Sequence, residues 1–429
     1  MVNAIEIGIF IAGVALGVLI NHAIYGLAYF PRAMGAWHRR SADLPPLSQG
    51  AWLPMVGWMF RRGESEYWGR GFWIRPMIIE CVVPFLLVGL YRAMMNGLTI
   101  PTSIRVAATD GPWTGGVVTG GGISSFEVIA QYIAYSVVLS ILLVATFIDI
   151  DERTIPDSIT IPGTWLGLFA STWIPGWTLW EVRETAPPAV RMLEPMQAGS
   201  PYAWETQWGQ HGPTGIGLWI GLLIWWIWCL SLGNLRWIGR RGMKKAWVYA
   251  WVGFWRSPNL PVVFGMAIVG SILITASYFG LSAERWQGLF SSLMGIGLGG
   301  LLVWSFRIVA GGVLGQEALG FGDVTLMAMV GAHFGWQIVL LAFFLAPLFG
   351  VALVIAYWVI TRDSAIPFGP YLAAATAYLM LDWARVWDAV SIVFVPVRIY
   401  LLFLAVLLVL LGTLLWLVRA LKVLWLTGR

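Results

Sequence analysis

The feature that most constrains this chain is a series of apolar segments, many of them close to 20 residues long, separated by polar stretches. A helix of about 20 apolar residues spans the hydrocarbon core of a bilayer and satisfies its own backbone groups there. The 429 residues are 59% hydrophobic and only 11% charged, whereas soluble domains carry about 25% charged residues. We therefore expect an all-α fold, a polytopic transmembrane helical bundle with roughly 8–11 spans.

The expected spans are placed by the length of each apolar run and by the polar residues that end it. In order, they cover residues 7–30, 76–95, 127–148, 158–175, 214–233, 261–281, 286–308, 323–335, 336–360, 367–381 and 397–418. The segment at 323–335 is short and contains glycine, so the topology of everything after it depends on whether it crosses the membrane.

Three regions are expected along the chain. Residues 1–95 hold the first two spans and a long basic loop, and residues 96–393 form the main membrane domain. Residues 394–429 add a C-terminal helix and a basic tail. Within the main domain, the stretches at 96–125, 176–213 and 234–260 are expected to be extramembrane loops.

Basic residues are unevenly distributed between these loops. The loops at 31–75 and 234–260 and the C-terminal tail are rich in arginine and lysine, whereas the loop at 176–213 carries several glutamates. Because basic loops remain on the cytoplasmic side of a membrane, strict alternation places both basic loops and the tail inside. The net charge of +5 is explained by these loops, so we expect a lipid bilayer and no nucleic acid as a partner.

Two aspartates lie where apolar segments end or begin, and the same alternation puts both on the cytoplasmic side. Asp149 ends the segment at 127–148, and Asp323 opens the segment at 323–335. A carboxylate at a membrane boundary is costly and is a functional-site hypothesis by default. Two carboxylates that share one proton can hydrolyse an amide, one activating water and the other polarising the carbonyl. We therefore predict that Asp149 and Asp323 form the catalytic pair of an aspartyl protease, with no metal and no cofactor.

The residues before Asp323 are expected to shape a supporting loop. Gly320 and Gly322 can adopt positive φ and can let another segment of backbone pass close to the carboxylate.

The residues after Asp149 are expected to break the helix. Pro156 disfavours helical backbone at the residue before it, so we predict a break over 151–157 that gives a substrate access to Asp149. Asp157 is predicted to be the N-cap of the next span. Asp151, Glu152 and Arg153 are interpreted as a solvated charge cluster.

Several separated blocks, in the same order, resemble the type IV prepilin peptidases. They are Asp149 followed by Pro156-Asp157, the block from Glu317 to Asp323, and Ile366-Pro367-Phe368-Gly369-Pro370-Tyr371. The resemblance implies that Asp149 and Asp323 are the catalytic pair. It also implies a multi-pass enzyme of the bacterial inner membrane, whose active site faces the cytoplasm. Such an enzyme removes the short basic leader from type IV prepilins or type II secretion pseudopilins.

The N-terminal region resembles the same family but departs from it at one point. Gly17, Asn21 and Tyr25 in the first span and Glu80 in the second fall on the family's pattern. Many members carry two C-x-x-C pairs in the loop between these spans, which bind zinc in a region linked to N-methylation. The loop at 31–75 has no cysteine, so the four-thiolate site cannot form. His38 and Asp43 offer a poor substitute, and the missing cysteines argue against N-methylation.

Other classes of function remain as alternatives. A proton- or ion-coupled transporter can use membrane carboxylates, although it predicts midplane positions and internal repeats that this sequence does not show. A related membrane aspartyl protease with other substrates and an inactive scaffold are the remaining alternatives. His22 and His333 lie without a serine-protease motif, so both are interpreted as packing or hydrogen-bonded groups.

Overall fold

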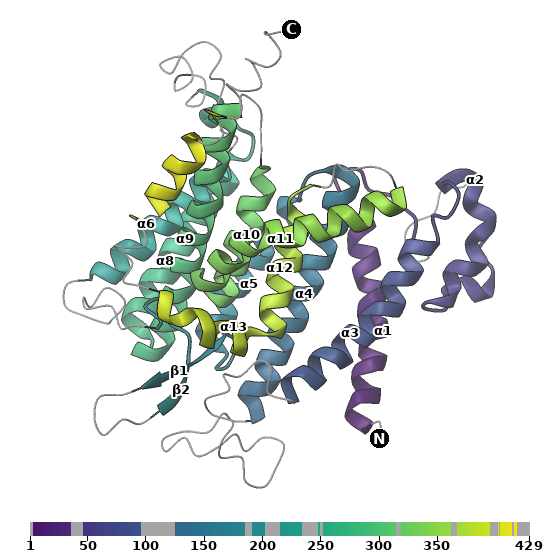
Figure 1. The fold of residues 1–429 in the computed structure, drawn as a ribbon, viewed down its shortest axis with the longest axis horizontal. Coiled ribbons are helices and arrows are strands. Elements are labelled where there is room, and N and C mark those ends of the chain that lie inside the picture. Colours follow the sequence, from purple (N-terminus) through teal and green to yellow (C-terminus); the bar gives the residue numbers. More distant parts are fainter. Residues whose placement is uncertain are drawn as a thin grey trace.

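The computed structural model describes residues 3–35, 46–95, 125–184, 191–201, 215–233, 248, 252–314, 319–361, 367–394, 402, 404–413 and 416–417. Over these residues the chain is a bundle of helices with one small β-hairpin (Figure 1). Five of the described helices are long and apolar enough to cross a membrane: Ala4–Gly26, Ile74–Met95, Phe126–Glu152, Leu260–Gly280 and Ala283–Val313. The expected all-α, polytopic fold class is confirmed.

Each of the first ten expected spans corresponds to a helix. The helices are α1 (Ala4–Gly26), α3 (Ile74–Met95), α4 (Ser125–Glu152), α5 (Asp157–Trp173), α6 (Ile216–Ser231), α8 (Leu260–Gly280), α9 (Ala283–Leu314), α10 (Phe321–Phe334), α11 (Trp336–Thr361) and α12 (Gly369–Leu381). Shorter elements are η1 (Gln49–Trp52), η2 (Val56–Glu64), α2 (Ser65–Trp68), α13 (Trp383–Val390) and η5 (Ser391–Val393). The last expected span, at 397–418, is described only in part, and Leu404–Thr413 is helical there.

The acidic loop at 176–213 contains regular structure that the sequence analysis did not predict. Strands β1 (Trp180–Glu184) and β2 (Arg191–Pro195) pair antiparallel, with Trp180 opposite Pro195 and Glu184 opposite Arg191. The hairpin is tied to the bundle by Trp383 Nε1, which donates to the carbonyl of Trp180 at 3.1 Å. Two strands of five residues give no apolar run of membrane length, so span prediction could not find them.

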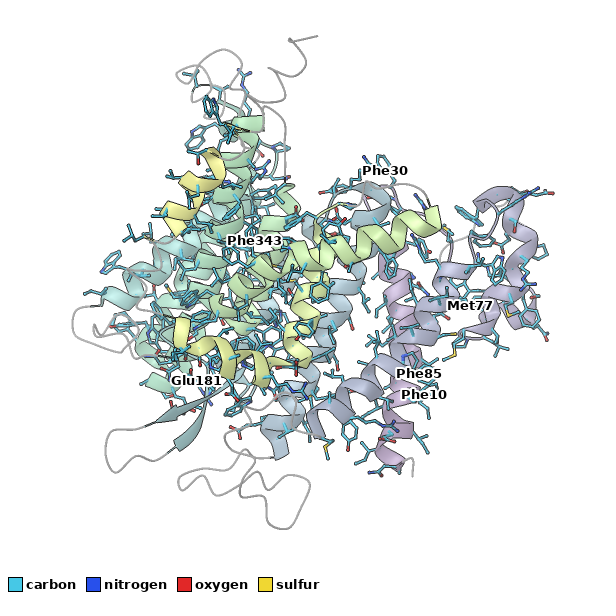
Figure 2. All side chains as sticks on the ribbon, in the orientation of Figure 1. Phe10, Phe30, Met77, Phe85, Glu181 and Phe343 are labelled. Carbon is cyan, nitrogen blue, oxygen red and sulfur yellow. The ribbon has the colours of Figure 1, made fainter. Side chains whose placement is uncertain are left out.

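Two hydrophobic cores share helix α4. The larger core is built mainly from α4, α5, α6 and α8 to α13, with Leu90 and Met94 of α3, and the smaller one from α1, α3 and α4, with Ile159 of α5 (side chains in Figure 2). In Figure 1, α1 and α3 lie together on one side of the molecule, with α4 between them and the main bundle. Helices α1 and α3 can approach closely because Gly13 has no side chain. A Cβ at Gly13 would lie only 2.6 Å from Pro84 Cα.

Helix α10 occupies the centre of the larger core, and its residues from Asp323 to Phe334 are buried. It packs mainly on α9 and α5, and a Cβ at Gly295 of α9 or Gly331 of α10 would collide with the backbone of the other helix. His333 accepts from Trp177 Nε1 at 3.0 Å through Nδ1, and its Nε2 lies 3.0 Å from the carbonyl oxygen of Gly163. The interpretation of His333 as a hydrogen-bonded core residue is confirmed.

Candidate active site

Asp149 lies inside the last turn of α4, not after the end of the helix. The helix continues to Glu152, and Arg153 follows with a φ of 56°. The predicted break is therefore shorter than expected, because it covers only the few residues between Glu152 and the start of α5 at Asp157. It ends at Pro156, whose extended backbone (φ −69°, ψ 137°) begins the next helix.

The surroundings of Asp149 give its carboxylate little stabilisation. The side chain is 4% exposed, and the described residues offer Oδ2 no hydrogen-bond partner. A buried unsatisfied polar group costs about 1–3 kcal/mol, and a negative charge in the last turn of a helix opposes the helix dipole. The backbone amide of Gly369, at the start of α12, faces this carboxylate. A Cβ at Gly369 would collide with Oδ2.

Asp323 lies at the N-terminal end of its helix, whereas Asp149 lies at the C-terminal end of α4. It is the third residue of α10 and is 5% exposed. Its Oδ2 accepts a hydrogen bond from the backbone N–H of Gly320 at 3.0 Å. A carboxylate in the first turn that reaches back to the N-cap amide satisfies a free donor and agrees with the helix dipole. Asp323 therefore stabilises the start of α10 whatever else it does.

The fold brings the two predicted aspartates together. Their carboxylates are close enough for their charges to interact. Ile155, in the short linker after α4, touches both neighbouring helix starts. A Cβ at Gly322 would lie 2.8 Å from Ile155 Cβ, and one at Gly369 would lie 3.0 Å from Ile155 Cδ1. The end of α4, the start of α10 and the start of α12 thus converge on one point.

The two glycines before Asp323 have different roles. Gly322 permits the predicted close approach, because a Cβ there would also lie 3.0 Å from the backbone nitrogen of Ile155. At Gly320 the nearest atom to an added Cβ is Asp323 Oδ2 at 3.6 Å, an ordinary contact. Neither glycine has a positive φ, so close packing at Gly322 is the reason for glycine here. Glu317, Ala318 and Ile366 lie outside the described residues.

The predicted N-cap role of Asp157 is wrong by one position. Asp157 is the first residue of α5, and Pro156 occupies the N-cap position without a side-chain capping bond. Proline has no side-chain acceptor, and the carbonyl of Pro156 accepts from the amide of Ile159 at 3.1 Å instead. A carboxylate at the first helical residue still favours the helix dipole.

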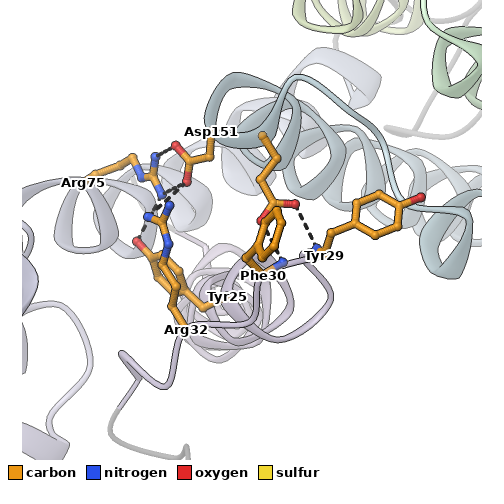
Figure 3. A network of polar contacts seen from close by, with 7 residues as sticks. Tyr25, Tyr29, Phe30, Arg32, Arg75 and Asp151 are labelled. Atoms are coloured by element: carbon orange, nitrogen blue, oxygen red, sulfur yellow. Dashed lines mark hydrogen bonds and ion pairs between the residues drawn. The ribbon is translucent and has the colours of Figure 1, made fainter.

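Asp151 and Glu152 are exposed and half-exposed, as a solvated charge cluster requires, but both are also bound by other segments of the chain. Arg75 of α3 binds Asp151 with both terminal nitrogens, at 2.6 and 2.8 Å, while Glu152 accepts from the backbone amides of Tyr29 and Phe30 at 2.8 and 3.0 Å (Figure 3). A cluster of charges at the end of a span does signal ion pairing. The sequence alone could not show which of the many arginines is the partner.

The sequence analysis also missed Arg307 of α9. Its Nε donates to the carbonyl of Leu319 at 3.1 Å, and its guanidinium lies 5.7 Å from the ring centre of Phe321. It is also close enough to interact electrostatically with Asp323. A cation near the end of an apolar helix was the signal that could have identified it.

In the N-terminal region, Asn21 and Gly17 of α1 lie against Glu80 of α3. Its carboxylate accepts from Asn21 Nδ2 at 3.0 Å, Trp58 Nε1 at 2.8 Å and the amide of Met55 at 2.6 Å. A Cβ at Gly17 would lie 2.9 Å from Glu80 Cα.

The loop between α1 and α3 is held by buried polar contacts where it is described. Arg61 pairs with Glu64 at 2.7 Å and donates to the carbonyl of Met34. Trp68 Nε1 also donates to Glu64, at 3.2 Å. Among the described residues, no group of three His, Cys, Asp or Glu side chains is placed to hold a metal ion. His38 and Asp43 fall outside that part of the chain.

Comparison with known proteins finds similarity in the part of the chain that holds both aspartates. Residues 136–187 and 255–355 match the model of the type IV leader peptidase family. These two stretches are therefore similar to the type IV leader peptidase family. Both aspartates of the site, together with Gly320, Gly322, Pro156 and Asp157, lie within the matched residues of the leader peptidase model.

Curated relatives of the leader peptidase region carry a consistent description. Proteins described as prepilin leader peptidase/N-methyltransferase are 39% identical in Pseudomonas aeruginosa, over 29% of this chain and 42% of the relative. In Pseudomonas putida the identity is 37%, over 24% and 35%, and in Aeromonas salmonicida it is 34%, over 23% and 38%. The matches span about two fifths of the length of these relatives. No solved structure matches the chain, and the comparisons give no support to the transporter alternative.

Proposed function

We propose that this protein is a membrane-embedded aspartic endopeptidase that removes the short basic leader from type IV prepilins or type II secretion pseudopilins. The observation that carries the proposal is the pairing of Asp149 and Asp323. Both are buried, they come from helices far apart in the sequence, and both lie in the residues that match the leader peptidase model. The N-methyltransferase activity in the relatives' description is not part of the proposal, because the 31–75 loop has no cysteine.

The chemistry needs only the two carboxylates and a water molecule. An ionised carboxylate removes a proton from the water, which attacks the scissile carbonyl carbon, while the protonated partner donates to the carbonyl oxygen. Collapse of the tetrahedral intermediate transfers a proton to the leaving amine, and the pair returns to sharing one proton. The assignment of base and acid between Asp149 and Asp323 stays open, since the two sites titrate as a coupled pair.

The environment of Asp149 supports a catalytic role more strongly than any single motif. A buried carboxylate with one unsatisfied oxygen, in an unfavourable position on the helix dipole, lowers the stability of the fold. A costly buried carboxylate of this kind is a functional-site hypothesis by default. Its neighbours Gly369 and Ile155 hold backbone and small apolar atoms close to the carboxylate, which restricts how much water reaches it.

Location and substrate binding form the next part of the proposal. The enzyme lies in the bacterial inner membrane as a multi-pass protein, with the site at the cytoplasmic face, as the distribution of basic loops predicts. The hydrophobic helix of the substrate packs against apolar helices in the bilayer, and its basic leader stays near that face. Residues 1–95, 96–393 and 394–429 are proposed as an N-terminal region, a peptidase domain and a C-terminal extension.

The test is prepilin cleavage in membranes, with wild type, Asp149→Asn and Asp323→Asn side by side and the products measured by mass spectrometry. Each substitution is expected to lower the rate by about 10²–10⁴-fold, because it removes an acid–base group. Asp382→Asn is the matched control, since Asp382 lies at the other end of α12 and pairs with Arg385 at 3.6 Å. Cleavage by either active-site variant at the wild-type rate would refute the proposal. The product mass also shows whether a methyl group is added.

A further inference from the structure

The segment that carries Asp149 is held from outside the peptidase region. Asp151 and Glu152 follow Asp149 in the last turn of α4, and both bind residues of the N-terminal region (Figure 3). We propose that Arg75, Asp151 and Glu152 are positioning residues, which fix this last turn and thereby set the distance between Asp149 and Asp323. This inference rests on the proposed function.

The contact between Arg75 and Asp151 is a bidentate salt bridge. Nη1 and Nη2 of Arg75 donate to Oδ1 and Oδ2 at 2.6 and 2.8 Å, and paired parallel bonds of this kind fix direction as well as distance. Arg32 adds a weaker ion pair to the same carboxylate at 3.9 Å. The two side chains of the main pair are 33% and 20% exposed, and ion pairs this exposed contribute little to overall stability. The main effect of this ion pair is therefore to fix the position of the last turn of α4, and its contribution to overall stability is small.

Glu152 fixes the same helix end to a second segment. Its two carboxylate oxygens accept from the amides of Tyr29 and Phe30, in the chain that leaves α1 at Gly26. In Figure 3, the Arg75 contact and the Tyr29–Phe30 contact lie on different sides of the helix end. The last turn is thus held by α3 on one side and by the segment after α1 on the other.

Without these contacts, the last turn of α4 has little to keep it ordered. Helix ends fray, and this one carries three carboxylates, on Asp149, Asp151 and Glu152, where the helix dipole already disfavours negative charge. The guanidinium of Arg75 neutralises one of these charges and holds the turn against fraying. A misplacement of about 1 Å can cost about 10²-fold in rate.

Larger structural support for this role comes from the contacts of the N-terminal region as a whole. Helices α1 and α3 pack against α4 through the smaller core. This core includes Ile148, directly before Asp149, and Val144, less than two turns before it. The N-terminal region therefore acts as a support for the catalytic helix.

The test compares two salt bridges that both involve helix α3, one to α4 and one to α1. Arg75→Gln and Asp151→Asn remove the bridge beside Asp149. Glu6→Gln and Arg92→Gln remove a bidentate bridge between α1 and α3, at 2.8 and 3.0 Å, near the other ends of these helices. Prepilin cleavage in membranes is measured as kcat and KM separately, together with thermal unfolding. We expect kcat to fall about 10–100-fold for the first two variants, with KM and unfolding temperature close to those of the control variants, which keep wild-type kcat.

Exchanging the two charged residues of the Arg75–Asp151 pair distinguishes a positioning role from a general loss of stability. Arg75→Asp combined with Asp151→Arg rebuilds an ion pair of opposite direction and is expected to recover kcat relative to either single change, which loss of folding would not allow. Glu152→Gln keeps an acceptor for only one amide and is expected to give a smaller fall in kcat than Asp151→Asn.

The outcomes separate this inference from the proposed function. Failure of the wild type to cleave prepilin overturns both. Wild-type kcat in Arg75→Gln and Asp151→Asn, with cleavage still lost in Asp149→Asn, overturns the positioning role and leaves the peptidase intact. An equal loss of kcat in the Glu6 and Arg92 variants, or absence of rescue by the exchanged pair, also overturns it, because the effect would then be one of general stability.

Discussion

The two aspartates of the site lie at opposite ends of their helices, and their surroundings differ accordingly. Asp323 is in the first turn of α10, where the helix dipole favours it and the amide of Gly320 donates to it. Asp149 is in the last turn of α4, where the dipole disfavours it and Oδ2 has no partner among the described residues. The carboxylate of Asp323 therefore stabilises the fold, whereas that of Asp149 lowers its stability.

This difference shows how a paired site can be built at limited cost in stability. A carboxylate that also caps a helix needs no further support, because its own contacts hold it in place. A carboxylate without such contacts needs support from its neighbours, and Asp149 receives it through Gly369 and through the charges that follow it in α4. Mutations should therefore affect activity at both positions and stability at only one.

Beyond replacement of the aspartates themselves, the largest expected effect is on the packing around Asp149. Gly369→Ala places a methyl group against Asp149 Oδ2, so the carboxylate must move and the cleavage rate should fall about 10–100-fold. Gly320→Ala is the matched control, because its Cβ meets no atom closer than 3.6 Å, and cleavage should stay near the wild-type rate. The measurement is the rate of prepilin cleavage in membranes. Equal rates for the two variants would show that the carboxylate of Asp149 is not confined as described.

The next effect is on stability and concerns Asp323. Asp323→Ala removes the acceptor for the amide of Gly320 and should lower the free energy of unfolding by about 1 kcal/mol, whereas Asp323→Asn keeps an oxygen acceptor and should lower it less. Asp149→Asn, which removes a buried unsatisfied charge, should not lower it at all. Thermal unfolding of the purified variants in detergent measures all three. A loss of stability in Asp149→Asn as large as that in Asp323→Ala would contradict the comparison.

The smallest effect concerns Arg307, which supports Asp323 as Arg75 supports Asp149. Arg307→Gln removes the charge near Asp323 and weakens the bond to the carbonyl of Leu319. Because Asp323 keeps its own bond to Gly320, the cleavage rate should fall only several-fold, in line with a single hydrogen bond at a charged donor. The same cleavage assay decides it, with Arg75→Gln for reference. A fall larger than that of Arg75→Gln would reverse the proposed order of support.

The sequence was sufficient to place the first ten helices and to pick out the two aspartates that the fold brings together, because both follow from local signals. Apolar length gives the helices, and a carboxylate at a span end stands out against it. The sequence was insufficient where partners come from far away. The bond from Arg75 to Asp151 joins residues 76 positions apart. The sequence alone does not distinguish Arg75 from the other arginines of the same loop as the partner of Asp151. The β-hairpin was missed because five-residue strands leave no long pattern.

The position of Asp157 shows the limit on a finer scale. A proline before an acidic residue predicts the start of a helix correctly, but the structure places Pro156 rather than Asp157 at the cap. Helix ends are defined to within one or two residues by local sequence. A role that depends on a single position, such as capping, is therefore beyond what the local pattern can assign.

The short, enclosed helix α10 has a consequence for how the protein is assembled. Its 14 residues rise about 21 Å, less than the roughly 30 Å of the hydrocarbon core, and its close contact with α9 requires that helix to be in place. Helix α10 is therefore poorly suited to insert independently during synthesis and should settle only after α5 and α9 have inserted. Asp323 then meets Asp149 at a late stage of biogenesis, so a partly made chain has no complete pair of carboxylates.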